Sequence, residues 1–149
     1  MTNSMNKPPI WFWIVSVIAL LWNAMGVMAY IADAYMTDEM ISLMDERQQA
    51  FQALEMPSWY TACYALAVFC GLLGCIFLLI RKSWAKPMFI ISFIAVLGQT
   101  LHNYVLNDIY AQMNLTVNTF ELSMAIAIPV VAILLILFSR DSARKSWIK

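Results

Sequence analysis

The chain has 149 residues, of which 62% are hydrophobic and 12% are charged, whereas soluble domains contain about 45–50% apolar and about 25% charged residues. This length suits a single domain, residues 1–149, and the composition excludes an ordinary water-soluble protein. Because the formal net charge is zero, no broad basic surface is available for a phosphate backbone, and we expect no nucleic-acid partner.

Four stretches of the chain are long and apolar enough to cross a bilayer as helices: residues 10–31, 59–80, 88–106 and 120–138. Each approaches the ~20 residues that cross about 30 Å of hydrocarbon. Lipid offers no partner to backbone N–H and C=O groups, and the stretches are about twice as long as a barrel strand requires. We therefore predict an all-α fold, an integral-membrane, up-and-down bundle of four helices.

A further helix is expected between the first two spans. Thr37 can cap a helix whose first turn carries Asp38 and Glu39. Apolar side chains then recur at helical spacing until Pro57 ends the pattern. We predict an amphipathic external helix over residues 38–55, which lies over the bundle or along the lipid headgroups; docking of a partner protein is the alternative.

The second span carries small residues at intervals of four. They form one row of four residues and a shorter parallel row: Cys63, Ala67, Gly71 and Cys75, then Cys70 and Gly74. Such rows allow neighbouring helix backbones to approach closely. We expect Ala67, Gly71, Gly74 and Cys75 to serve helix packing within the bundle; contact with a second copy of the chain is the alternative.

Polar residues of three spans fall at a similar depth in the outer half of the bilayer, counted at about 1.5 Å per residue. Those of the third span share one stripe, and those of the first two lie on faces rich in small residues. We predict that they line one ligand-binding pocket beneath the external helix: Asn23, Tyr64, Gln99, His102 and Asn103. The alternative is that they only join the helices, at about 0.6 kcal/mol for each hydrogen bond.

Known catalytic and metal-binding patterns are absent from the sequence. His102 is the only histidine, so neither a bis-histidine haem nor an ordinary zinc site can be assembled, and no span offers the carboxylate of a proton-coupled antiporter. Ser-His-Asp, H-E-x-x-H and Gly-rich phosphate motifs are missing as well. We expect no catalytic residue, no metal and no cofactor, and an enzyme that uses His102 as acid or base ranks last.

The last span opens with Asn118-Thr119-Phe120-Glu121, which has the spacing of a capping box, and it contains Pro129, which we expect to kink the helix.

Charges flanking the four spans are divided by sign. Eight of the nine basic residues lie before the first span, between the second and third, or after the fourth, and eight of the nine acidic residues lie in the other two loops. The positive-inside rule therefore predicts that both chain ends are cytoplasmic.

Several segments resemble a group of small bacterial four-span inner-membrane proteins. The segments are 21–26 (LWNAMG), 57–60 (PSWY), 67–74 (AVFCGLLG) and 78–85 (LLIRKSWA), followed by Ser92. The resemblance covers most of the chain from Trp11 to the end of the third span and is weakest in the last loop and fourth helix. It implies the bacterial inner (plasma) membrane and, for members labelled as sugar transporters, solute transport, and it supplies no catalytic residue.

Two functions fit these patterns. The first is a non-enzymatic binding or accessory protein that holds a lipid-like or small molecule, or a partner subunit, in the outer half of the bundle. The second is a small-solute, sugar-like transporter that acts as a homo-oligomer, because four helices leave little room for an alternating-access path. The two halves of the chain show no convincing similarity, which favours the first function over a transporter built from repeats. Membrane lipids are expected partners in both cases.

Overall fold

The computed structural model describes residues 6–106 and 116–149, apart from the side chains of Val105 and Leu106. Within these ranges the regular structure is helical, without a strand. The elements are α1 (Ile10–Ala34), α2 (Asp38–Ser42), α3 (Glu46–Gln52), α4 (Ser58–Leu79), α5 (Ala85–Leu101), the π-helical turn η1 (His102–Leu106) and α7 (Thr119–Arg144). The all-α prediction is thereby confirmed.

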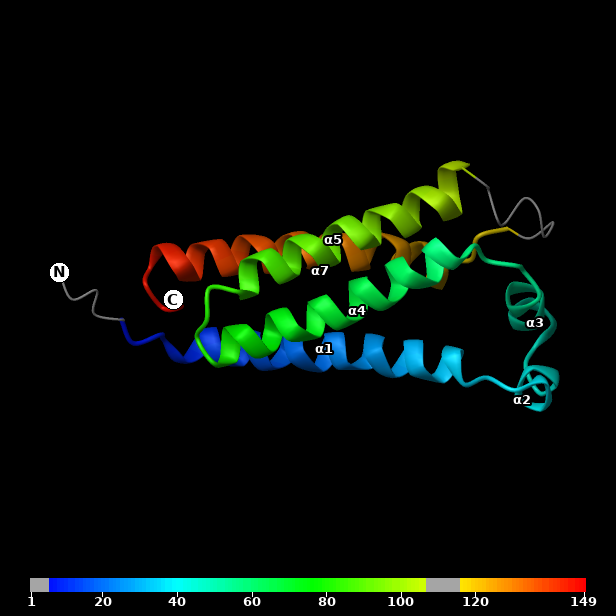
Figure 1. The fold of residues 1–149 in the computed structure, drawn as a ribbon, viewed down its shortest axis with the longest axis horizontal. Helices are drawn as coiled ribbons and strands as arrows, with labels where there is room; N and C mark the ends of the chain where they lie inside the picture. Colours follow the sequence, from blue (N-terminus) through cyan, green and yellow to red (C-terminus); the bar gives the residue numbers. More distant parts are fainter. Residues whose placement is uncertain (1–5, 107–115) are drawn as a thin grey trace.

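Four of the helices, α1, α4, α5 and α7, run along the long axis of the molecule (Figure 1). Each is long and apolar enough to cross a bilayer, so the protein is a multi-pass membrane protein. Both chain ends and the α4–α5 connection lie at one end of the bundle, called here the terminal end, and α2 and α3 lie at the other, called the loop end (Figure 1).

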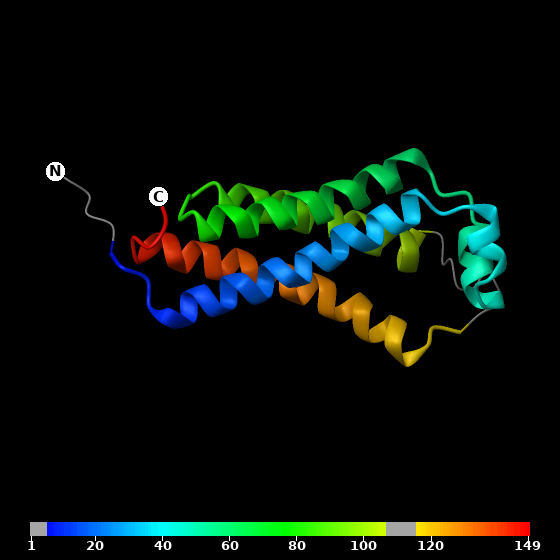
Figure 2. The same ribbon diagram turned by 90° about the horizontal axis from the view of Figure 1, so that it is seen from below.

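The four long helices do not close into a symmetric ring. Along the chain, α1 packs on α4, α4 on α5, and α5 on α7. Near the terminal end α1 and α7 meet, since the rings of Phe12 and Phe138 are 5.5 Å apart and those of Trp11 and Phe138 are 5.7 Å apart. Towards the loop end the two helices diverge (Figure 2). The bundle is therefore tight at one end and splayed on one side at the other.

Helix starts follow capping groups in the sequence. The Thr37 hydroxyl accepts a hydrogen bond from the Met40 amide at 3.3 Å, at the start of α2. At the start of α7, Asn118 Oδ1 accepts from the Glu121 amide at 2.8 Å and Glu121 Oε2 accepts from the Asn118 amide at 3.0 Å, the reciprocal bonds of a capping box. The helix then continues through Pro129 to Arg144.

The external segment differs from the expected single helix over residues 38–55, because it forms two short helices, α2 and α3. Asp45 explains the break. Its side chain accepts a hydrogen bond from the Gln48 amide at 2.8 Å and so caps a new helix, and an Asp that bonds to the backbone in this way competes with helix continuation. The side-chain amide of Gln49 donates to the Met44 carbonyl at 2.8 Å and stabilises the resulting turn.

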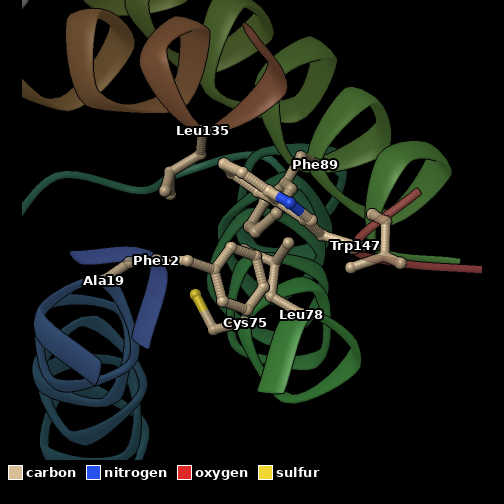
Figure 3. Packing of buried hydrophobic residues seen from close by; sticks show 9 residues of the cluster. Phe12, Ala19, Cys75, Leu78, Phe89, Leu135 and Trp147 are labelled. Carbon is tan, nitrogen blue, oxygen red and sulfur yellow. The ribbon is translucent and has the colours of Figure 1, made fainter. Parts of the chain in front are cut away.

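The terminal end is filled by a buried apolar cluster drawn from all four long helices and the C-terminal segment (Figure 3). Phe12 is fully buried and Phe89 is 2% exposed. Trp147 lies over them from beyond α7, with its ring 5.4 Å from that of Trp11 and 5.8 Å from that of Phe12. This cluster holds the four helices together where they converge.

Hydrogen bonds to backbone groups join the two chain ends to the α4–α5 connection at the same end of the bundle. Arg81 adopts a positive φ of 61° in the α4–α5 connection, and its carbonyl accepts from the Lys149 amide at 2.8 Å. The Ser83 amide donates to the Lys149 carbonyl at 2.5 Å. The Arg81 guanidinium also donates to the carbonyls of Trp147, at 2.7 Å, and Asn6, at 2.5 Å. The two chain ends and the α4–α5 connection thus form one closed layer.

Candidate functional site

A cavity of about 320 Å³ lies among the four long helices. Five lining residues come from α1, three from α4, four from α5 and five from α7. Most are apolar, and four carry an amide or hydroxyl group: Asn23, Tyr64, Ser92 and Gln99. None of the described residues that line the cavity is charged. Three of the five residues predicted to bind a ligand, Asn23, Tyr64 and Gln99, therefore share one cavity.

Asn23 joins α1 to α4 through the small residues of α4. Its side-chain amide donates to the Ala19 carbonyl at 2.9 Å and to Cys75 Sγ at 3.4 Å. Its oxygen lies directly against Gly71, where any Cβ would overlap it. A glycine at this position is what allows the two helices to approach with an asparagine between them. Asn23 therefore forms part of the cavity wall and also part of a helix contact.

Ser92 makes the corresponding contact between α5 and α4. Its hydroxyl donates to the Ala67 carbonyl at 2.6 Å, and both residues are buried. Two turns away along α4, Gly74 lies against the ring of Phe89, whose Cε1 would be 2.6 Å from a Cβ on the glycine. The four residues expected to serve helix packing, Ala67, Gly71, Gly74 and Cys75, are all buried in α4.

Three side chains of the cavity lining keep hydrogen-bonding capacity. Within residues 6–106 and 116–149, no hydrogen bond engages the side chains of Trp22, Tyr64 or Gln99. The Tyr64 ring is held edge-on against that of Tyr30, with centroids 5.2 Å apart. An indole N–H can only donate, whereas a phenol and a primary amide can donate and accept. The cavity therefore combines apolar walls with unused neutral polar groups.

His102 and Asn103 lie outside this lining. The His102 side chain is 4% exposed, and its ring is 5.0 Å from that of Trp59 and 5.1 Å from that of Tyr60. Asn103 Nδ2 donates to the Tyr60 hydroxyl at 3.0 Å. Both residues belong to η1, about one turn beyond Gln99, and they contact Trp59 and Tyr60 at the start of α4 instead of the cavity. The five predicted site residues thus form two separate groups.

At the loop end, α3 connects α1 to α7 across the side on which they diverge. Arg47 donates to both carboxylate oxygens of Glu121, at 2.8 and 2.5 Å, and to the Thr116 carbonyl at 2.8 Å. Gln52 donates to Asp33 Oδ1, on α1, at 2.7 Å. We call these contacts the α3 bridge. In the sequence, Arg47 is the one basic residue that lies in a loop with most of the acidic residues. This unusual position could have indicated that Arg47 forms an ion pair there.

A second hollow, of about 490 Å³, lies between α5 and α7. Its lining is apolar except for Thr100 and Tyr104. The Thr100 hydroxyl already donates to the Val96 carbonyl at 3.0 Å, and lining residues such as Leu122 and Ile126 are 51% and 57% exposed. This hollow has the properties of a surface that lipid chains cover, and it lacks the free polar groups of the cavity.

Comparison of the chain with protein-family models, with curated proteins and with solved structures gives no match. In the part of the chain that the structure describes, no three His, Cys, Asp or Glu side chains gather as a metal site requires. The resemblance to small bacterial four-span proteins therefore stays a prediction.

Proposed function

We propose that this protein is a non-enzymatic membrane protein that binds a lipid-like molecule in the cavity among its four long helices. The observation that carries the proposal is the set of unused polar groups on Trp22, Tyr64 and Gln99 in an apolar cavity. These side chains are only partly buried, but the bilayer core contains no bulk water to pair with them, and a polar group without a partner in an apolar environment costs free energy. A bound molecule with an apolar body and a polar head offsets that cost.

The divergence of α1 and α7 supports entry from the side. These two helices form facing walls of the cavity, with Met25 and Ala29 on α1 and Met124, Ile128 and Ala132 on α7. They separate towards the loop end (Figure 2). We therefore propose that a lipid enters from the surrounding bilayer on the side of α1 and α7, without leaving the hydrocarbon. The α3 bridge connects the ends of α1 and α7 at the loop end through Arg47–Glu121 and Gln52–Asp33.

The alternative, a small-solute transporter acting as an oligomer, has less support. Transport requires a second state in which the cavity opens at the terminal end. That end is filled by Phe12, Phe89 and Trp147 and is joined by the backbone bonds of Arg81, Ser83 and Lys149. A binding or accessory role requires no such opening.

Binding is tested by native mass spectrometry of the protein extracted together with its lipids, which reports bound mass and subunit number. We expect the wild-type chain to retain a lipid-sized mass. Ala132→Phe places a phenyl ring in the cavity and should reduce the bound fraction at least tenfold. The matched control is Ala62→Phe, at an exposed position of α4 outside the cavity lining. Equal lipid retention by both variants would contradict the proposal, and a bound mass equal to one further chain would indicate a homo-oligomer instead.

We also propose that the protein resides in a bacterial inner membrane with its terminal end in the cytoplasm. Lys82 and Lys86 at this end, with the other basic residues there, and Asp38 and Glu46 at the loop end, with most acidic residues, support the orientation through the positive-inside rule.

Reporter tags fused to either chain end should therefore both register cytoplasm. Cysteines introduced at Asp45 and Thr116 should react with a membrane-impermeant maleimide added from outside, with the parent protein as the background control. The reason is the eight-to-one division of basic residues, which sets orientation where loops are short. A periplasmic signal from either chain end would refute the orientation.

A further inference from the structure

We infer that the head group of the bound lipid is uncharged and carries a hydroxyl or carbonyl oxygen. The inference rests on the proposed function and specifies the class of lipid. Its first basis is that the described lining of the cavity contains no acidic, basic or histidine side chain. The described charged residues flank the cavity only at the two ends of the bundle, as Glu121 and Asp33 do at the loop end.

A phosphate or ammonium group would be poorly accommodated in this cavity. Moving a charge out of water is costly unless an opposite charge or several hydrogen bonds compensate. The lining offers only neutral dipoles, and two of them are already engaged, since Asn23 donates to Ala19 and Cys75, and Ser92 donates to Ala67. Phospholipids keep their charged heads at the water interface at much lower cost.

The unused groups match an oxygen acceptor. The Trp22 indole donates, and Tyr64 and Gln99 can each donate or accept. A carbonyl oxygen accepts from these donors, and a hydroxyl oxygen accepts while its proton can be donated to Tyr64 or Gln99. Along α1, Trp22 precedes Asn23, which contacts Gly71 and Cys75, whereas Tyr64 packs on Tyr30. The donors are therefore spread along the cavity, and each can pair with a different oxygen of the ligand.

The size of the cavity fits a head group together with the first part of a chain. Its volume of about 320 Å³ is near the lower limit of ligand pockets, roughly 300–1,000 Å³. Apolar residues such as Val68, Val96 and Met124 line the remainder. The rest of the chain would extend between α1 and α7 into the bilayer, so the head group, and not the chain, determines selectivity.

The test compares lipids that differ only in the head group. Delipidated protein in detergent is titrated with dioleoylglycerol, dioleoyl phosphatidic acid and dioleoyl phosphatidylethanolamine, and bound mass is followed by native mass spectrometry. We expect dioleoylglycerol to bind at least tenfold more tightly than either phospholipid. The 3-O-methyl ether of dioleoylglycerol, which keeps both ester carbonyls and lacks the hydroxyl proton, distinguishes the two kinds of head: binding as tight as that of dioleoylglycerol assigns a carbonyl ligand, and weaker binding assigns a hydroxyl ligand.

Variants connect the selectivity to the cavity. Gln99→Leu should weaken binding of the preferred probe at least tenfold. Tyr64→Phe removes one hydroxyl, keeps the ring contact with Tyr30, and should weaken the same probe several-fold without lowering the unfolding temperature. If either phospholipid binds as tightly as both uncharged probes, the head-group inference is overturned while the proposed function stands. If no probe binds wild type more tightly than Ala132→Phe, the proposed function itself fails.

Discussion

Gly74→Leu is expected to prevent the protein from accumulating in a folded form. A Cβ at this position would lie 2.6, 2.8 and 2.9 Å from three ring carbons of Phe89, and that ring is 2% exposed within the cluster at the terminal end. The ring packs within this cluster and also lines the cavity, so a leucine at position 74 must either push the ring towards the cavity or force α4 and α5 apart. Inserting a side chain into a packed core typically costs about 1–3 kcal/mol and occasionally more, and a leucine here falls at or above the upper limit.

Alanine substitutions at Gly74 and Gly98 compare a crowded glycine with an uncrowded one by their effect on the free energy of unfolding. Gly74→Ala adds only the Cβ and should lower the free energy of unfolding by roughly 1–3 kcal/mol. At Gly98 on α5, the added Cβ would meet Cys63 Sγ at 3.7 Å, an ordinary contact distance, so Gly98→Ala should leave stability near that of wild type. Yield of monodisperse protein and the midpoint of thermal unfolding measure both effects. If Gly74→Leu and Gly74→Ala retain wild-type stability, this row of α4 faces lipid and the packing is wrong.

Packing and site depend on the same residues of α4. Gly71 makes room for the Asn23 oxygen, and Ala67 presents its carbonyl to Ser92. Both contacts bring α1 and α5 onto α4 along one side, and α7 reaches only α5 closely along its length. Because α7 packs closely only on α5, it can diverge from α1. The small residues of one helix thereby create the asymmetry that leaves a cavity.

The fold was predictable because each of its main features has a local cause. Hydrophobic stretches of membrane-spanning length produce the four long helices, and the capping box at Asn118 and Glu121 marks the start of α7. The break in the external segment was missed because the same acidic residue, Asp45, suits a helix N-cap as well as a solvent-exposed position on a continuous helix.

The candidate site was only partly predictable. Depth and helical face were enough to bring Asn23, Tyr64 and Gln99 to one cavity. The same reasoning placed His102 with them, because helical face alone does not show that His102, about one turn beyond Gln99, packs on Trp59 and Tyr60 at the start of α4. The contribution of α7, through residues such as Met124 and Ala132, was missed because this helix is apolar on every side and carries no stripe that identifies its inner face.

The second large effect is expected from Trp147→Ala. Trp147 is 9% exposed and lies beyond the end of α7. Its ring contacts those of Trp11 and Phe12, and Lys145 Nζ lies 4.8 Å from its centroid. Truncating a buried tryptophan to alanine costs about 3–5 kcal/mol. We expect a loss of this order in the free energy of unfolding, measured by thermal or chemical unfolding in detergent.

Trp84→Ala is the matched control, because Trp84 lies at the same end of the bundle and is 64% exposed. Its truncation leaves no buried cavity, so stability should change little. The comparison also bears on the choice between binding and transport. If the terminal end opens during function, its cluster must be only weakly stabilising, and Trp147→Ala would then be tolerated as well as Trp84→Ala. A large loss confined to Trp147→Ala agrees with a permanently closed terminal end, in which the cavity exchanges its ligand only with the bilayer.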